Sequence, residues 1–269
     1  MEAALFAKML SDPSILDLKK LGYKYPQTDM QEFVGLLKAG FYRELPLRDF
    51  DGKPMVWLES VAQVSLSAVR VLMTPRQSAR QYGAKAMEEE ILATFQIEQI
   101  NTTRESVRRI LAGSAPVNES EQRVYGMKKG LDFIADPAHR ITEENLFQLY
   151  QMAVGDFLTE ENRLPAGQYY RQDTVYIVGS KLEHTGLPWQ KLPAYMAELI
   201  AFAGQDTGHN DLLKAAMLHF DLAYLHPYFD GNGRMARLLH LWYLVQCGYS
   251  SALFVPLSRY IEESRARYY

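Results

Sequence analysis

Residues 226–237 bring together side chains that phosphate chemistry requires. The segment is His-Pro-Tyr-Phe-Asp-Gly-Asn-Gly-Arg-Met-Ala-Arg, and apolar residues surround it on both sides. A polar segment is therefore expected inside a folded core, where polar groups are costly unless they are paired or used. This placement makes the segment the first candidate for a functional site.

Two predicted helices flank this segment. Apolar residues recur at helical spacing in residues 211–225 and again in residues 234–246. Pro227 ends the first helix, because the residue before a proline is displaced from the α region. Between the helices, residues 230–233 form a turn sequence whose glycines can adopt positive φ. A glycine-rich loop that leads into a helix N-terminus offers an anion free N–H groups and a favourable helix dipole.

The charged side chains of the segment suit a bound polyphosphate. Arg234 and Arg237 are three residues apart and share one face of the second helix, and guanidinium groups pair well with phosphate oxygens. Asp230 offers an oxygen ligand to a hard cation such as Mg²⁺. His226 can take a proton from a hydroxyl nucleophile at neutral pH. Each residue alone also fits an ordinary structural role, but together they predict a polyphosphate site with a metal ligand and a general base.

The segment resembles the signature of the Fic-domain family, His-Pro-Phe-x-[Asp/Glu]-Gly-Asn-Gly-Arg-x-x-Arg. The matching residues are His226, Pro227, Asp230, Gly231, Asn232, Gly233, Arg234 and Arg237. Tyr228 stands where the family usually has Phe, an aromatic that anchors the loop in the core. The exchange keeps an aromatic anchor, although a buried hydroxyl needs a partner. The resemblance covers roughly residues 88–269.

The resemblance implies a mainly α fold, a Fic-type helical bundle with a small β-hairpin flap. It also implies the transfer of AMP from ATP to a Tyr, Ser or Thr hydroxyl of an unknown target protein. In this analogy His226 deprotonates the hydroxyl and Asp230 holds Mg²⁺ on the α- and β-phosphates. The residues implied to hold the phosphates are Gly231, Asn232, Gly233 and Arg234, with Arg237 on the γ-phosphate.

Other activities stay open at this point. The resemblance implies that the loop contacts the phosphates rather than the nucleobase, so the signature does not identify the donor. The alternatives are transferases that use UTP, GTP, a phosphocholine donor or a phosphate donor. A non-catalytic nucleotide-sensing module is an alternative of a different class. The intact His226 argues against that module, since binding alone needs no base.

A second stretch resembles the family's target-binding flap. Its residues are Thr174, Val175, Tyr176, Ile177, Val178 and Gly179, and their composition favours a strand. Residues 167–171 precede it as a lead-in, and residues 184–188 resemble the family's His-x-x-Pro-Pro turn, with Leu187 in place of the first proline. An ordinary surface hairpin gives the same pattern. The functional interpretation is an edge strand that receives a target peptide by β-augmentation.

The predicted helix before the signature contains an unusual glutamate. Ile91, Phe95 and Glu98 fall on one helical stripe, so the apolar pattern places the Glu98 carboxylate on the buried face. A buried carboxylate needs a cation or several donors. A glutamate that reaches solvent from the helix end is equally compatible with this spacing.

The family resemblance favours the buried interpretation of Glu98. Fic proteins often carry an inhibitory helix with the pattern [Ser/Thr]-x-x-x-Glu-[Gly/Asn], which Thr94 and Glu98 match and Gln99 departs from. In the family this glutamate pairs with the second signature arginine, here Arg237, and displaces the γ-phosphate. The resemblance thus implies the subclass with an N-terminal inhibitory helix, at about residues 87–99. In some relatives the same glutamate aligns a water that removes AMP.

Composition and charge narrow the class of protein. A net charge of −3 and a pI near 6.1 argue against a broad nucleic-acid-binding face. The single cysteine, Cys247, allows no intramolecular disulfide and suits a cytosolic protein. No apolar run approaches the roughly 20 residues of a membrane span, and the N-terminus lacks the pattern of a secretory signal. We therefore expect a cytoplasmic protein that does not enter a membrane.

The sequence predicts two domains. Residues 1–75 read as a mostly helical unit with a β-hairpin, because residues 41–47 and 54–58 flank the turn sequence Asp-Gly-Lys at 51–53. Residues 76–269 form the predicted Fic-like catalytic domain. Two roles are open to the N-terminal unit, recognition of the target or formation of a homodimer.

Further helices complete the expected fold. Residues 63–73 and 83–100 read as helices, and Asn118 and Thr142 read as the N-caps of two more. The chain ends at Tyr269 in a segment that begins like a helix and shows no end signal. Members of the family that it resembles usually continue further, so the sequence is compatible with a truncated C-terminus or with an unusually short relative.

Overall fold

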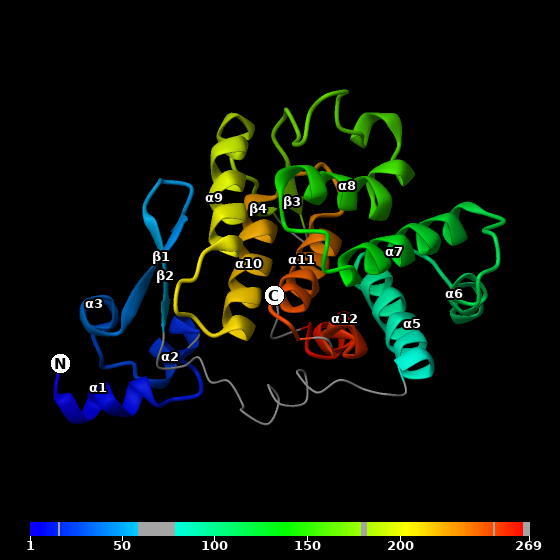
Figure 1. The fold of residues 1–269 in the computed structure, drawn as a ribbon. Coiled ribbons are helices and arrows are strands. Elements are labelled where there is room, and N and C mark those ends of the chain that lie inside the picture. Colours follow the sequence, from blue (N-terminus) through cyan, green and yellow to red (C-terminus); the bar gives the residue numbers. More distant parts are fainter. Residues whose placement is uncertain (16, 59–78, 179–181, 250, 266–269) are drawn as a thin grey trace. The chain divides into compact units, whose positions relative to one another are not determined.

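The computed structural model has two compact units, Met1–Gln63 and Val64–Tyr269 (Figure 1). The described residues are 1–15, 17–58, 79–178, 182–249 and 251–265. The domain boundary expected near residue 75 and the helix predicted at 63–73 lie outside these ranges. Each unit is described by itself.

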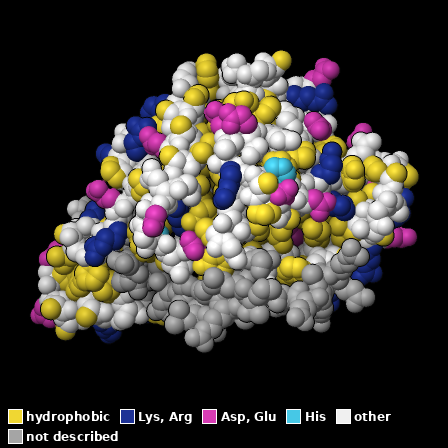
Figure 2. Space-filling view, viewed as in Figure 1, with side chains coloured by type: hydrophobic (Ala, Val, Ile, Leu, Met, Phe, Trp, Pro, Cys, Tyr) yellow, Lys and Arg dark blue, Asp and Glu magenta, His cyan; other side chains and the backbone are white. Residues whose placement is uncertain are grey.

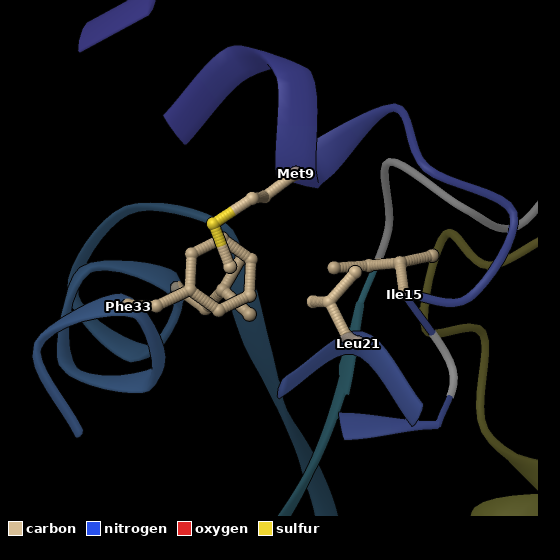
Figure 3. Packing of buried hydrophobic residues seen from close by; sticks show 5 residues of the cluster. Met9, Ile15, Leu21 and Phe33 are labelled. Carbon is tan, nitrogen blue, oxygen red and sulfur yellow. The ribbon is translucent and has the colours of Figure 1, made fainter. Parts of the chain in front are cut away.

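Over its described residues, the N-terminal unit packs three short helices with a β-hairpin. The helices are α1 (Ala3–Leu10), α2 (Leu18–Lys24) and α3 (Met30–Gly40), and the strands are β1 (Tyr42–Arg48) and β2 (Pro54–Leu58). Figure 3 shows the core of this unit, where Met9, Ile15, Leu21 and Phe33 meet with little or no exposed surface. The predicted hairpin is confirmed, since β1 and β2 pair antiparallel and Gly52 adopts a φ of 83° in the turn.

In the part that the structure describes, the second unit is a helical bundle with one small hairpin. Its helices are α5 (Ala79–Ile97), α6 (Arg104–Leu111), α7 (Glu119–Ala135), α8 (Glu143–Ala153), α9 (Leu192–Gly204), α10 (Asp211–Leu225), α11 (Asn232–Gln246) and α12 (Leu257–Glu263). The hairpin consists of β3 (Tyr176–Val178) and β4 (Leu182–Thr185). Short 3-10 turns occur at Gly155–Phe157, Glu160–Asn162, Trp189–Lys191 and Ala252–Phe254. The predicted mainly helical fold with a small hairpin is confirmed.

The packing of this bundle is centred on two neighbouring helices. Helix α10 lies beside α11, α9 packs on α10, and α7 contacts both α8 and α11 (Figure 1). Helix α12 lies against α5. Trp242 of α11 is fully buried, and its indole N–H donates to the His139 carbonyl at 3.0 Å. The loop between α10 and α11 is therefore held between two packed helices.

Most helix boundaries follow the expected end signals. Asn118 accepts a hydrogen bond from the N–H of Glu121 at 2.9 Å, and Thr142 accepts one from Asn145 at 3.2 Å, so both predicted N-caps are confirmed. Helix α10 has the predicted bounds. Helix α11 begins two residues earlier than expected, because the turn closes at Gly231.

The surface of the molecule carries both signs of charge. On the face shown in Figure 2, Lys and Arg side chains are interspersed with Asp and Glu side chains. Within the described part of the chain, every helix is too short or too polar to cross a lipid bilayer.

Candidate functional site

His226 occupies a strained position at the end of α10. Its φ of 54° and ψ of 60° place it in the left-handed region, where Pro227 prevents the helix from continuing. Its Nδ1 atom lies 3.3 Å from the Ala223 carbonyl. Because a carbonyl only accepts hydrogen bonds, Nδ1 carries the hydrogen in the neutral ring. Nε2 is then the proton-accepting nitrogen, which is the state that a general base needs.

Asn232 holds the signature loop in shape. Its Oδ1 accepts from the N–H of Tyr228 at 2.9 Å, and its Nδ2 donates to the Tyr228 carbonyl at 2.8 Å. Only 2% of Asn232 is exposed. Both polar groups of the side-chain amide are thus used on the loop backbone.

Tyr228 anchors the same loop in the core. Its ring is buried and stacks on Tyr150, with centroids 3.9 Å apart and an interplanar angle of 10°. Tyr150 is also fully buried, and its hydroxyl has no hydrogen-bond partner among the described residues. Burial, followed by the charge of Asp230, raises the pKa of the Tyr150 hydroxyl. The aromatic pair therefore fills the space beneath the loop and lies near its carboxylate.

Gly231 is required by both conformation and space. Its φ is 80°, and a Cβ atom there would lie 2.4 Å from Cγ1 of Val154. It is the N-cap of α11 and offers no side-chain acceptor to the first N–H groups of that helix. Uncapped N–H groups at a helix N-terminus, together with the helix dipole, attract an anion.

Arg234 adds a positive charge to this helix terminus. The residue is 3% exposed, and its Nε has no hydrogen-bond partner within the described ranges. Its Nη2 lies 3.4 Å from Oδ2 of Asp230. Burial lowers the pKa of Arg234, but a guanidinium stays charged at neutral pH. A buried cation with an unpaired N–H beside an uncapped helix terminus is suited to a phosphate.

The surroundings of Asp230 fit a magnesium ion carried on phosphates. Half of its side chain is exposed, and Oδ1 accepts from the N–H of Gly231. The described residues contain no group of three or more His, Cys, Asp or Glu side chains that could hold a metal. Mg²⁺ typically binds through one or two carboxylates plus substrate phosphates. A single carboxylate beside a phosphate site is therefore an adequate donor set for this ion.

Glu98, which directly follows α5, pairs with Arg237 of α11. Arg237 is buried, donates through Nη2 to the Glu98 carboxylate, and donates through Nε to Oγ1 of Thr94 at 2.9 Å. The Glu98 carboxylate also covers Gly233, where a Cβ atom would lie 2.5 Å from Oε1. It thus lies against the positive end of α11, in the place where an anion would bind. Its side chain is 22% exposed, so the alternative of a solvated helix-end glutamate does not describe it.

The end of α5 shows why the family pattern has Gly or Asn after the glutamate. The N–H of Ile100 donates to the Phe95 carbonyl at 2.8 Å, and the N–H of Gln99 donates to the Gln96 carbonyl at 3.2 Å. These two bonds form a Schellman motif, which requires a left-handed residue at its centre. Gln99 occupies that position with a φ of 56°. The motif is preserved at a residue type that adopts it with strain.

The structure describes most of the predicted flap. Residues Tyr176 and Ile177 of β3 pair with Thr185 and His184 of β4, and Tyr176 is 64% exposed. Thr174 and Val175 precede the strand, while Gly179 falls outside the described residues. In the described sheet, β3 pairs with β4 only. Its position at the edge matches the geometry that β-augmentation needs.

Comparison with known proteins is consistent with this geometry. Residues 140–244 match the model of the Fic/DOC family. A Drosophila ananassae protein named "Protein adenylyltransferase Fic" is 24% identical in an alignment of 188 residues that covers 66% of this chain and 35% of that protein. The crystal structure of a Fic family protein from Desulfovibrio desulfuricans has a TM-score of 0.62 at 20% identity, covering 77% of this chain and 66% of that chain. Residues 140–244 thus match the Fic/DOC family, and the chain has the fold of a Fic protein.

A second solved structure supports the fold. A Fic domain containing signaling protein from Bacteroides thetaiotaomicron has a TM-score of 0.57 at 20% identity, covering 68% of this chain and 71% of that chain. The chain spans about a third of the length of the Drosophila ananassae relative. The two likenesses to solved structures show the fold.

Two buried polar contacts of the second unit are not predicted by the sequence. Arg171, which the sequence placed only in the lead-in to the flap, is buried and donates to the carbonyls of Asp173, Leu187 and His226. Acceptors on the backbone leave no trace in residue types, so no sequence signal pointed to this role.

The second feature is a buried contact between α5 and α12. Both oxygens of the Glu90 carboxylate accept hydrogen bonds from Ser258, and burial raises the pKa of Glu90. Glu90, Thr94 and Glu98 are each four residues apart, so they share one face of α5. That spacing was the signal that could have indicated a third polar position on this face.

Replacing Gln99 by Gly is expected to stabilise the protein. Relief of a left-handed strain of roughly 1–2 kcal/mol exceeds the extra chain entropy that glycine loses, so the free energy of unfolding should rise by about 0.5–1 kcal/mol. Denaturant unfolding measures this change. As a control, Gly in place of the exposed helical Lys85 should lower stability by about 1 kcal/mol. Equal losses in both variants would contradict the left-handed assignment of Gln99.

Proposed function

We propose that this Fic-domain protein transfers AMP from ATP to a Tyr, Ser or Thr hydroxyl of a target protein. The observation that carries the proposal is the anion site at the start of α11. Uncapped N–H groups and the buried Arg234 with an unpaired Nε lie in the first turn of α11, and His226 lies at the end of α10, a few residues earlier in the chain. The name of the Drosophila ananassae relative supports the same activity.

The proposed reaction assigns a step to each polar group. Nε2 of His226 takes the proton of the target hydroxyl, whose oxygen attacks the α-phosphorus. A bond forms between that oxygen and phosphorus, the bond to the β-phosphate oxygen breaks, and pyrophosphate leaves. Arg234 and the N–H groups of Gly233 and its neighbours stabilise the charge that develops on the phosphoryl oxygens. Asp230 would hold Mg²⁺, which neutralises phosphate charge when bound.

The flap provides a way to present the target. An extended peptide that adds to the exposed edge of β3 would be held by main-chain hydrogen bonds. Both ends of the flap are bonded to the loop that carries His226, since Arg171 joins them. A hydroxyl on such a peptide would therefore be delivered next to the base.

We also propose that Glu98 inhibits the transferase. Arg237 cannot serve the γ-phosphate while its guanidinium is paired with the Glu98 carboxylate. The same carboxylate covers Gly233, so it competes with phosphate for the helix terminus as well. This arrangement supports assignment to the subclass with an N-terminal inhibitory helix. Removal of AMP with a water aligned by Glu98 is a further activity that this position would allow.

We propose further that the donor is ATP rather than a UTP, GTP, phosphocholine or phosphate donor. We also propose that the protein forms a homodimer, and that it is cytoplasmic and has no nucleic-acid partner. Mass spectrometry after incubation with each donor distinguishes the transferases, because each adds a different mass. Nucleotide binding without any mass gain would favour the sensing module.

Loss of the proposed base should abolish transfer without abolishing binding. In His226→Ala the rate is expected to fall about 10²–10⁴-fold, the usual contribution of a general base. Calorimetry should still detect ATP, because the anion site does not use the imidazole. His209→Ala serves as the control and should retain activity. Transfer at the parental rate in His226→Ala would exclude His226 as the base.

Removing the Glu98 carboxylate should activate the enzyme. Labelling of the protein with ATP is expected to rise at least tenfold in Glu98→Gly, which corresponds to about 1.4 kcal/mol of released competition. Glu105→Gly, at an exposed position of α6, is the matched control and should label at the parental level. Equal labelling of Glu98→Gly and the parent would rule out inhibition by Glu98.

Magnesium dependence tests the role of Asp230. In the Glu98→Gly background, chelation with EDTA should stop transfer and added Mg²⁺ should restore it. Asp230→Asn should weaken the apparent affinity for Mg²⁺ by about tenfold or more, since even indirect ligand contacts change metal affinity 10–100-fold. Asp156→Asn, at an exposed residue, should leave the Mg²⁺ titration unchanged. A titration curve for Asp230→Asn that overlays the control would remove Asp230 as the ligand.

A further inference from the structure

Arg171 is a buried cation that is bound almost entirely by backbone. Only 1% of the residue is exposed, and in the part of the chain that the structure describes it forms no ion pair with a carboxylate. Its Nε donates to the His226 carbonyl at 2.7 Å, Nη1 donates to the Asp173 carbonyl, and Nη2 donates to the Leu187 carbonyl. Burial lowers the pKa of Arg171, so the site keeps a charge in an environment that opposes it.

The three carbonyls belong to three separate segments. Asp173 precedes β3, Leu187 follows β4, and His226 begins the signature loop. Backbone bonds connect the same segments, since the N–H of Arg171 donates to the Pro227 carbonyl at 3.0 Å and the N–H of Leu187 donates to the Leu225 carbonyl at 3.3 Å. One guanidinium therefore joins both ends of the flap to the loop.

The junction is tightly packed. A Cβ atom on Gly186 would lie 2.6 Å from Nη2 of Arg171 and 3.3 Å from Cβ of His226. The base, the guanidinium and the turn after β4 thus share one small space. A side chain of any size at residue 186 would displace one of them.

The hydrogen bond from Arg171 to the His226 carbonyl holds a residue whose backbone conformation is unfavourable. His226 is held in a left-handed conformation, which costs an L-residue roughly 1–2 kcal/mol. Its carbonyl also lies at the C-terminal end of α10, where unpaired carbonyls and the helix dipole favour a cation. By holding this carbonyl, Arg171 sets the orientation of the peptide plane that follows the Cα atom of His226, and this Cα atom carries the imidazole.

We propose that Arg171 is a positioning residue that aligns His226 with a target peptide bound along the flap. This inference rests on the proposed transferase function. Among the described residues, Arg171 contacts none of the signature groups assigned to phosphate. Its loss should therefore impair the transfer step and leave nucleotide binding intact. A residue with a merely structural role would impair both together.

The kinetic test compares variants in the Glu98→Gly background. Arg171→Met should bind ATP within about twofold of the parent by calorimetry, while transfer falls about 100-fold, the effect expected of a 1 Å misplacement. Arg171→Lys keeps the charge and part of the hydrogen bonding, and should recover about tenfold of that loss. Arg163→Met is the matched control, because Arg163 donates to one carbonyl, that of Leu158, and should transfer at the parental rate. Parallel losses of binding and transfer in both Arg171 variants would overturn the proposal.

A second measurement does not depend on activity. Nitrogen-15 NMR of labelled histidines should show His226 as a single Nδ1–H tautomer in the parent, with its signal identified from His226→Ala. Arg171→Lys, chosen because it retains the charge, should shift or broaden this signal, and Arg163→Met should not. An unchanged His226 signal overturns the positioning role even in a protein that transfers nothing. A changed signal without transfer by the parent supports the role and removes the transferase instead.

Discussion

The buried guanidinium of Arg237 is stabilised by a negative partner, and the arrangement of the site follows from this ion pair. Breaking a buried ion pair by removing one partner typically costs about 3–5 kcal/mol. Glu98 is this partner in the structure, with Thr94 satisfying Nε. A phosphate could take over only as the carboxylate leaves. Under the proposed function, exchange between two anions at one cation would make the site switch between two states rather than adjust gradually.

Two helix ends must meet for this exchange to be possible. A carboxylate is disfavoured at the C-terminal end of α5 and favoured at the N-terminal end of α11, so Glu98 gains from facing Gly233. Asn232 keeps the N-terminal end of α11 in shape, because both atoms of its amide bind the loop backbone. Helix α12 keeps α5 in place through Ser258 on Glu90 and through Arg259 on Glu89 at 2.6 Å. The ion pair therefore depends on contacts made far from it in the chain.

The helices could be predicted from the sequence more fully than the side-chain contacts between them. The bounds of α10 and the caps at Asn118 and Thr142 could be predicted, because periodicity and capping act within a few residues. Periodicity alone could not decide whether Glu98 is buried, since its partner lies 139 residues away. The role of Arg171 was beyond prediction, because its acceptors are backbone carbonyls. The sequence shows only that Gln99 departs from the Gly or Asn of the inhibitory-helix pattern. The positive φ of Gln99 in the structure explains why Gly or Asn is preferred at this position.

The left-handed Gln99 has a consequence for how α5 moves. Strain at the last residue of a turn lowers the free energy needed to open that turn, while the preceding turns keep their full stability. Local opening of one turn would carry Glu98 away from Arg237, and Glu89 and Glu90 would stay bonded to α12. We therefore expect amide protons at the end of α5 to exchange with solvent faster than those in its middle. The helix would then fray at one end as a separate unit instead of moving as a rigid body.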